Sequence, residues 1–500
     1  MAATWVLVFL SFAFRLPPLL NARSTNSDAA VVGLQAMHVL RGELSPFLWG
    51  SGYQTSADAF VAAAFFAVLG PTPLALMASA LCLHVLATWL VFATLRRRFD
   101  PWTSLLVTMP LVLSPSSIHS YALYPPRQLS ITLAVAALWA IDGAGARNTR
   151  RASAWLALGG ALYGLAVSAD PYPMVLAPVI LGYALLVSID RPWARLPSLG
   201  TAMLAGLVPF GLLHRAAGAK SGPLGLTTSV LRHNWDLLVR ECLPWALSYK
   251  VYYARNVMDY VPWEAPPFVR IVQLMGAFVV ATIVVVGIGG VFAKRIPWSS
   301  RRLGFIGASS YPVVIGAFLV SVMVMDHFSM RYLALLTVML PFASVPAVFI
   351  LGRKPFALLI TPYLVASALG GWVGYGPFVR GVRPVRETPE LRDDYALFDL
   401  LQSRGIEHAQ ADYWASYRLT FLFGERVVVV PTNPAEDRYA PYRRAFESAP
   451  TFAYVFDRGR SREDLAQVER ALAKSSARVE KATAGAHTVF IVTRAAAPTR

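Results

Sequence analysis

The chain has 500 residues and a formal net charge of +17 at pH 7. Apolar residues make up 56% of it and charged residues 15%, well below the roughly 25% charge of soluble proteins. This composition excludes a series of soluble domains and predicts an integral membrane protein. Nucleic-acid binding is disfavoured, because the basic residues of the first 380 positions lie largely in short gaps between apolar runs, as topology signals do.

Apolar runs predict about 11 membrane crossings. The predicted spans are residues 3–20, 74–95, 102–120, 127–142, 153–169, 172–189, 197–213, 268–293, 304–325, 331–351 and 355–375. The apolar run 59–69 is too short to cross, since about 20 residues are needed, and Pro71 and Pro73 follow it. It predicts a re-entrant or interfacial helix.

Basic residues gather after the even-numbered spans. These clusters are Arg96 to Arg98, Arg147 with Arg150 and Arg151, Arg191 with Arg195, Lys294 to Arg302, and Arg353 with Lys354. The short loops 121–126, 170–171 and 326–330 contain no lysine or arginine. Because basic loops stay in the cytoplasm, we expect a multi-pass protein of a bacterial inner (plasma) membrane with a cytoplasmic N-terminus and outward-facing odd-numbered loops.

Three larger segments then face outward. They are a first loop, 21–73, with interfacial helices, a long aromatic-rich loop, 214–267, and everything after about residue 380. In the last segment, helix-like stretches at 391–404, 435–448 and 462–474 alternate with strand-like runs at 426–430, 452–456 and 488–493. The predicted fold class is an all-α polytopic membrane domain, residues 1–380, with a small extracytoplasmic α/β domain, residues 381–500.

Two acids mark the first loop. Ser27 or Asp28 is a suitable N-cap for an amphipathic helix, 30–40, on the outer interface, and Asp58 heads the short helix 59–69. Paired carboxylates at a membrane surface suit general-base work on a hydroxyl or amine, or metal binding. The alternative is that both acids only cap their helices.

Arginines at the outer ends of spans are the second candidate group. Arg127 and Arg331 lie there against the topology bias, and Arg15 is similarly placed. Arginine suits a lipid-linked phosphate, although snorkelling to the head groups is the alternative. Asp170, His327 and Tyr332 lie on the same side. By contrast, we expect His84 and the aromatic side chains of 214–267 to serve in packing.

Several stretches resemble the GT-C superfamily of membrane glycosyltransferases, which includes protein O-mannosyltransferases and the lipid A aminoarabinose transferase. They are Arg15-Leu16, the Ser-Asp-Ala-Ala-Val-Val-Gly-Leu-Gln stretch 27–35, a second acid before a helix ending Leu69-Gly70, Arg331 to Leu333, and the segment 411–427. The resemblance implies a sugar donor on a polyprenyl phosphate and inversion at the anomeric carbon. It also implies Asp28 as the general base or metal-assisting carboxylate, and Asp58 as the second acid. Ala29 departs from the Asp-Glu pair of many relatives.

The resulting hypothesis is sugar transfer to a glycan, lipid or protein acceptor of the cell envelope, on the outer, periplasmic side. Arg127 and Arg331 would hold the donor phosphate, and Tyr53, Gln54, Asp170, His327 and Tyr332 would contact substrate. A divalent metal, Mg or Mn, could join Asp28 and Asp58. One alternative function is that of a transporter or flippase, but the sequence shows no internal repeat of the kind many transporters have. Another is a non-catalytic assembly or receptor protein.

Overall fold

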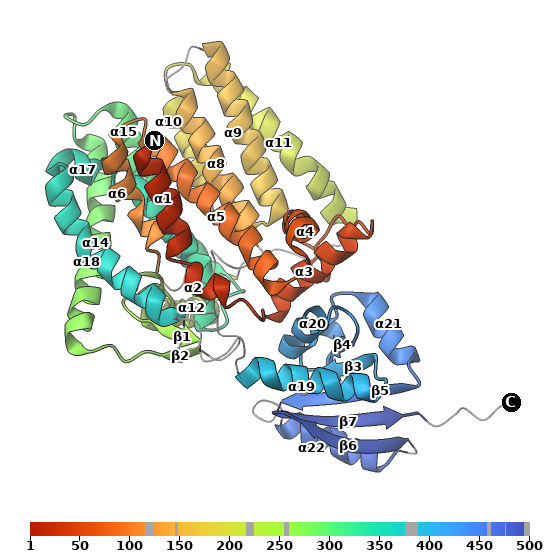
Figure 1. The fold of residues 1–500 in the computed structure, drawn as a ribbon. Coiled ribbons are helices and arrows are strands. Elements are labelled where there is room, and N and C mark those ends of the chain that lie inside the picture. Colours follow the sequence, from red (N-terminus) through yellow and green to blue (C-terminus); the bar gives the residue numbers. More distant parts are fainter. Residues whose placement is uncertain are drawn as a thin grey trace.

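A computed structural model describes residues 1–115, 125, 127–145, 149–216, 225–254, 260–375, 389–457, 462–475 and 477–494. A body of packed helices stands beside a small sheet domain, with α3 and α4 between them (Figure 1). The helices of the body are α1 (Ala2–Ala13), α2 (Leu16–Leu20), α3 (Ser27–Leu40), α4 (Ala57–Leu69), α5 (Pro73–Leu95), α6 (Pro101–Val112), α8 (Gln128–Ala144), α9 (Thr149–Ala169), η1 (Tyr172–Leu176), α10 (Ala177–Val187), α11 (Pro192–Ala216), α12 (Thr228–Leu237), η2 (Leu238–Cys242), α13 (Leu243–Ala246), α14 (Pro267–Gly289), η3 (Gly290–Phe292), α15 (Trp298–Val320), η4 (His327–Leu333), α16 (Ala334–Ala343), α17 (Val345–Leu351) and α18 (Arg353–Gly374).

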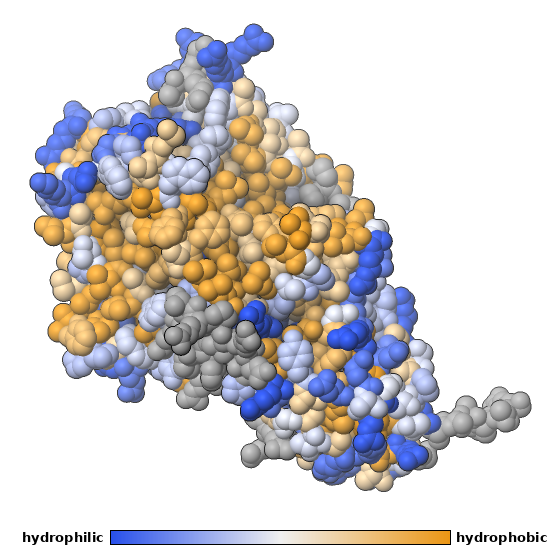
Figure 2. All heavy atoms as spheres, viewed as in Figure 1, coloured by the Kyte–Doolittle hydropathy of each residue, from blue (hydrophilic) through white to orange (hydrophobic). Residues whose placement is uncertain are grey.

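The helical body confirms a multi-pass membrane protein. Six helical segments are long and apolar enough to cross a membrane: Pro73–Leu95, Arg150–Ala169, Pro267–Phe292, Trp298–Val320, His327–Leu351 and Arg353–Gly374. Apolar side chains form a broad band across the helical body (Figure 2). The other predicted spans correspond to shorter or less apolar helices, so the total of 11 crossings stays a prediction. Helix α4 has 13 residues, about 20 Å at 1.5 Å per residue, which is too short to cross.

The first predicted span is interrupted. Helix α1 ends at Ala13, and Arg15 follows with a side chain that is fully buried. Its guanidinium donates to the carbonyl oxygens of Leu111 at 2.8 Å and Val112 at 3.0 Å. These are carbonyls of the last turn of α6, which lack partners within the helix. Arg15 therefore closes the end of α6 and is not exposed at the outer edge. Residues 116–120 of the predicted span 102–120 lie outside the described residues.

The arginine-rich loops meet at one end of the helical body. Arg97 and Arg98 both pair with the buried Asp142 at the end of α8. Arg98 also donates to the carbonyl of Ser299 at 3.0 Å, and Arg302 donates to the carbonyl of Leu186 at 3.4 Å. The ends of α5, α8 and α10 and the start of α15 therefore share one face, as the arginine pattern predicts. Which compartment that face meets stays a prediction, and Arg147 lies outside the described residues.

The first loop differs from its prediction in burial. Helix α3 is buried from Ser27 to His38 apart from the half-buried Asp28, so it does not lie on an open membrane interface. Its N-cap is Asn26, whose side chain accepts from the N–H of Ala29 at 3.1 Å. The prediction of a one-sided helix fails because α3 packs against α4 on one side and against the C-terminal segment on another.

The C-terminal segment contains a mixed five-stranded sheet in the order β4-β3-β5-β7-β6. Strand β3 is parallel to β4 and β5, whereas β7 is antiparallel to β5 and β6. The strands are β3 (His408–Ala411), β4 (Val428–Pro431), β5 (Thr451–Asp457), β6 (Arg478–Ala484) and β7 (His487–Thr493), and the helices are α19 (Pro389–Ser403), α20 (Tyr413–Leu422), η5 (Pro434–Glu436), α21 (Ala440–Ser448) and α22 (Arg462–Ala473). The prediction missed β3, α20 and β6. A second small sheet, β1 (Tyr252–Ala254) with β2 (Tyr260–Pro262), lies in the long loop.

This sheet-containing segment, called the tail domain below, docks on α3. Apolar side chains of α3, α4, α20 and the sheet share one buried cluster. At the edge of this cluster, His38 Nδ1 lies 2.7 Å from Glu43 and Nε2 lies 2.7 Å from Glu425 of the tail domain. Arg41 also pairs with Glu425. Apolar packing and the contacts of His38 and Arg41 with Glu425 together hold the tail domain against the first loop.

Candidate functional site

Asp58 binds the N-terminal end of another helix. Its Oδ2 accepts from the N–H of Arg127 at 2.9 Å, and its Oδ1 accepts from the N–H of Leu129 at 3.3 Å. A carboxylate is favoured there by the orphan N–H groups and the helix dipole. The side chain is buried, and burial raises the pKa of Asp58 to about 6 against the lowering effect of the two N–H groups. Asp58 thus fixes the start of α8.

Arg127 occupies a strained backbone conformation at that helix start. Its φ of 87° lies in the left-handed region, where a side chain costs roughly 1–2 kcal/mol. Its Nε lies 2.9 Å from Oδ2 of Asp170, a residue that is 1% exposed. Asp170 also accepts from the N–H of Tyr172 at 2.7 Å and from the amide of Gln54. The backbone and the guanidinium of Arg127 are therefore each held by a buried carboxylate.

Two arginines meet at one aromatic ring. The guanidinium carbon of Arg127 lies 5.6 Å from the centroid of Tyr332, and that of Arg331 lies 5.1 Å from it. Arg331 Nη2 donates to the hydroxyl of Tyr332 at 3.3 Å. The hydroxyl of Tyr172 donates to the carbonyl of Tyr332 at 3.2 Å and ties this segment to the Asp170 loop. Two cations gathered at one tyrosine ring suit a phosphate.

Asp28 belongs to a different set of contacts. Its Oδ1 accepts from the hydroxyl of Tyr413 at 2.5 Å and lies 3.9 Å from Nη2 of Arg438. Both partners come from the tail domain. Among the described residues no hydrogen bond joins Asp28 to Asp58. The structure thus brings together Asp58, Arg127, Asp170, Gln54, Arg331 and Tyr332, and it places Asp28 in a neighbouring cluster.

A short loop between α3 and α4 connects the two clusters. At one end of it, the carbonyl of Gly50 accepts from Nη1 of Arg438 at 3.0 Å. At the other, Gln54 reaches Asp170, and the N–H of Thr55 donates to the carbonyl of Ala169 at 3.1 Å. Tyr53 lies between these ends and is 41% exposed. A molecule resting on this loop would lie between Asp28 and the two arginines.

His327 is placed apart from this cluster. Its ring stacks on Tyr252 with centroids 4.9 Å apart and on Trp245 at 6.0 Å. Trp245 is almost fully buried, so the aromatic side chains around it serve in packing, as the sequence indicates for the long loop. Tyr413 and Arg438 were not predicted as site residues from the sequence. Asp412, which N-caps α20 through the N–H of Trp414 at 2.9 Å, was the available local signal for that helix.

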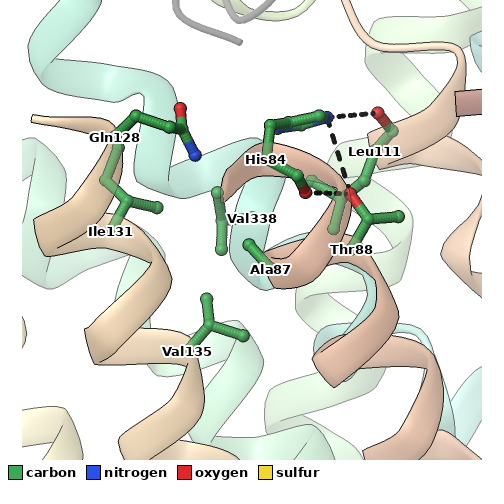
Figure 3. A pocket seen from close by; sticks show the side chains of 8 residues that line it. All are labelled: His84, Ala87, Thr88, Leu111, Gln128, Ile131, Val135 and Val338. Carbon is green, nitrogen blue, oxygen red and sulfur yellow. Dashed lines mark hydrogen bonds between the residues drawn. The ribbon is translucent and has the colours of Figure 1, made fainter. Parts of the chain in front are cut away.

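A narrow cavity lies within the helical body next to the first turn of α8 (Figure 3). Gln128 borders one side of it, and His84 borders another. The Nε2 of His84 lies 3.3 Å from the carbonyl of Leu111 and 3.5 Å from the hydroxyl of Thr88. His84 is therefore a packing residue with satisfied polar contacts, as expected, in a cavity whose other lining is largely apolar.

The carboxylates do not fit a metal bridged between them. Both oxygens of Asp58 accept backbone N–H groups, and Asp28 faces a tyrosine hydroxyl and an arginine. Among the described residues no group of three or more histidine, cysteine, aspartate or glutamate side chains could hold a metal ion.

The chain is similar to known glycosyltransferases in fold. The family model for dolichyl-phosphate-mannose-protein mannosyltransferase matches residues 57–213, which include Asp58, Arg127 and Asp170. The apo crystal structure of ArnT from Cupriavidus metallidurans aligns with a TM-score of 0.50 and 15% identity, covering 98% of each chain. This chain has the fold of the GT-C glycosyltransferases. The GT-C resemblance of its sequence is thereby confirmed.

Two further solved structures align less well. The oligosaccharyltransferase AglB from Archaeoglobus fulgidus, in complex with an inhibitory peptide and a dolichol-phosphate, has a TM-score of 0.47 and 11% identity over 91% of this chain and 69% of that one. The arabinofuranosyltransferase AftD from Mycobacteria has a TM-score of 0.46 and 14% identity over 99% of this chain and 40% of that one. No curated protein matches the sequence.

Proposed function

We propose that this GT-C protein transfers a sugar from a polyprenyl-phosphate donor to an acceptor of the cell envelope, on the face of the membrane where the tail domain lies. The observation that carries the proposal is the meeting of Arg127 and Arg331 at Tyr332. Two cations at the end of membrane helices match a phosphate presented at the membrane surface by its lipid tail. The family match over residues 57–213 supports the same reaction class.

The reaction is a single displacement that inverts the anomeric carbon. An acceptor hydroxyl attacks that carbon, the bond from the carbon to the phosphate oxygen breaks, and the electron pair leaves with the polyprenyl phosphate. Arg127 and Arg331 stabilise the charge that develops on this phosphate. Asp28 takes the proton of the attacking hydroxyl. Tyr53, Gln54 and Tyr332 line the surface where the sugar would rest.

Asp58 and Asp170 act through Arg127 in this proposal. Asp58 holds the left-handed backbone at the start of α8, and Asp170 orients the guanidinium through Nε. Fixing a cation before the substrate arrives reduces the reorganisation needed in the transition state. Asp58 is therefore a positioning residue for the phosphate site.

The test is turnover by purified protein in lipid vesicles. Polyprenyl-phosphate donors carrying hexose, pentose and aminopentose sugars are supplied with a cell-envelope extract, and released polyprenyl phosphate is measured. We expect release with at least one donor and its loss in Asp28→Asn. Replacing Arg331 by glutamine should raise the donor KM at least tenfold, because a charge-assisted contact contributes about 1.5–3 kcal/mol.

Arg353→Gln is the matched control, since this arginine is exposed and begins α18 at the opposite end of the body. Its donor KM should equal that of the wild type. Binding of the donors without release of polyprenyl phosphate, in every combination, would favour a transporter or receptor and reject the transferase.

A further inference from the structure

The tail domain reaches into the candidate site through two side chains. The Tyr413 hydroxyl donates to Oδ1 of Asp28 at 2.5 Å, and Arg438 Nη2 lies 3.9 Å from the same oxygen. Tyr413 is the first residue of α20, where the N-cap Asp412 fixes the helix start. Tyr413 and Asp28 are 385 positions apart in the sequence.

Arg438 is fixed on both sides of the interface. Its Nε donates to the hydroxyl of Tyr413 at 3.1 Å, and its backbone N–H donates to the hydroxyl of Tyr417 at 2.5 Å. On the first loop, its Nη1 donates to the carbonyl of Gly50 at 3.0 Å. Tyr413 and Arg438 are thus held in place by the tail domain and by the loop that borders the site.

The two oxygens of Asp28 have different surroundings. Both tail-domain contacts are made with Oδ1. Within the described part of the chain no hydrogen bond reaches Oδ2, and the side chain of Asp28 remains 39% exposed. A general base must present one oxygen within hydrogen-bond reach of the attacking group and keep a fixed orientation. Holding one oxygen and exposing the other meets both requirements.

We propose that Tyr413 and Arg438 are positioning residues that hold Oδ1 of Asp28 and thereby present Oδ2 to the acceptor. This inference rests on the proposed role of Asp28 as the base. It gives the tail domain a part in the reaction beyond covering the first loop, because the base is correctly oriented only while the tail domain is docked.

The first test compares Tyr413→Phe with Tyr439→Phe. Tyr439 lies in the same docking interface, and its hydroxyl donates to Glu43 at 3.2 Å, so the control removes the same group without touching Asp28. In Tyr413→Phe we expect kcat to fall about ten- to a hundredfold with the donor KM unchanged. The control should keep the wild-type kcat. An equal loss in both variants, or a loss carried by the donor KM, would overturn the inference.

The second test needs no turnover. Wild type, Tyr413→Phe and Tyr439→Phe are treated with a water-soluble carbodiimide and glycinamide, and modification of Asp28 is followed by mass spectrometry. Removing the Tyr413 hydroxyl should speed the modification severalfold, while the control should match the wild type. Equal rates in all three proteins would reject the positioning role. If the wild type labels as expected but releases no polyprenyl phosphate from any donor, the proposed transfer fails while the carboxylate contact stands.

Discussion

Replacing Asp58 by asparagine keeps the side chain's shape and removes its charge. This separates the cost of burying the charge from the benefit of the hydrogen bonds to the start of α8. The ordinary carboxyl pKa of 3.8 is raised by burial to about 6 in Asp58. Between these values the unfolded chain gives up the proton while the folded chain keeps it. The free energy of unfolding therefore falls as pH rises from about 4 to 6, by about 3 kcal/mol. Above pH 6 the ionised, buried Asp58 is a net cost to stability.

Asparagine removes this cost but makes weaker hydrogen bonds to the start of α8. Its amide oxygen can accept from one of the N–H groups of Arg127 and Leu129, and the other N–H loses its partner at about 1–3 kcal/mol. At pH 7.5 the free energy of unfolding of the variant should therefore lie within about 2 kcal/mol of that of the wild type. The pH dependence of this free energy between pH 4 and 6 should disappear. The left-handed Arg127 would be less firmly held, so the donor KM should rise about tenfold.

Thermal unfolding followed by tryptophan fluorescence at pH 5 and pH 7.5 checks the first part, and donor KM checks the second. Asp100→Asn is the control, because Asp100 caps α6 through the N–H of Trp102 at 3.0 Å at the opposite end of the body. There the hydroxyl of Thr103 lowers the pKa of the aspartate, so the loss of charge should destabilise by about 1 kcal/mol at pH 7.5. A wild-type donor KM together with an unchanged pH dependence in Asp58→Asn would refute the reasoning.

Three further outcomes are expected. Burial alone would lower the pKa of His38, but its hydrogen bonds with Glu425 and Glu43 raise the pKa overall. The stabilisation of tail-domain docking by His38 is therefore complete below pH 6.5 and is lost as pH rises through the folded-state pKa. The melting temperature of the wild type, but not of His38→Gln, should fall between pH 6 and pH 9. Asp142→Asn leaves the buried guanidinium of Arg98 without its carboxylate and should destabilise the protein by about 3–5 kcal/mol while the donor KM stays constant. A raised donor KM would contradict the separation of the two ends of the helical body. Gly33→Ala places a Cβ 2.8 Å from the Phe421 ring and should loosen the tail domain in limited proteolysis, whereas Gly316→Ala, with open space around its Cβ, should digest like the wild type.

The sequence by itself determined the properties that depend on a local run of residues. The lengths of the apolar runs predict most of the long helices, because crossing or packing in a membrane requires a continuous apolar segment. The arginine clusters predict which helix ends meet, and the contacts of Arg98 and Arg302 confirm it. Asp28, Asp58, Arg127 and Arg331 were all identified in this way, since a charge at the edge of an apolar segment is visible locally.

Only the tertiary structure decided what these charges contact. Asp58 begins one helix but binds the N-terminus of another, and Asp28 meets Tyr413 and Arg438 of the tail domain rather than Asp58. Strand β3 was missed because its His-Ala-Gln-Ala sequence has no strand periodicity; it is a strand because parallel neighbours on both sides satisfy its backbone. Such partners lie tens to hundreds of residues away, so no local pattern of spacing or polarity encodes them.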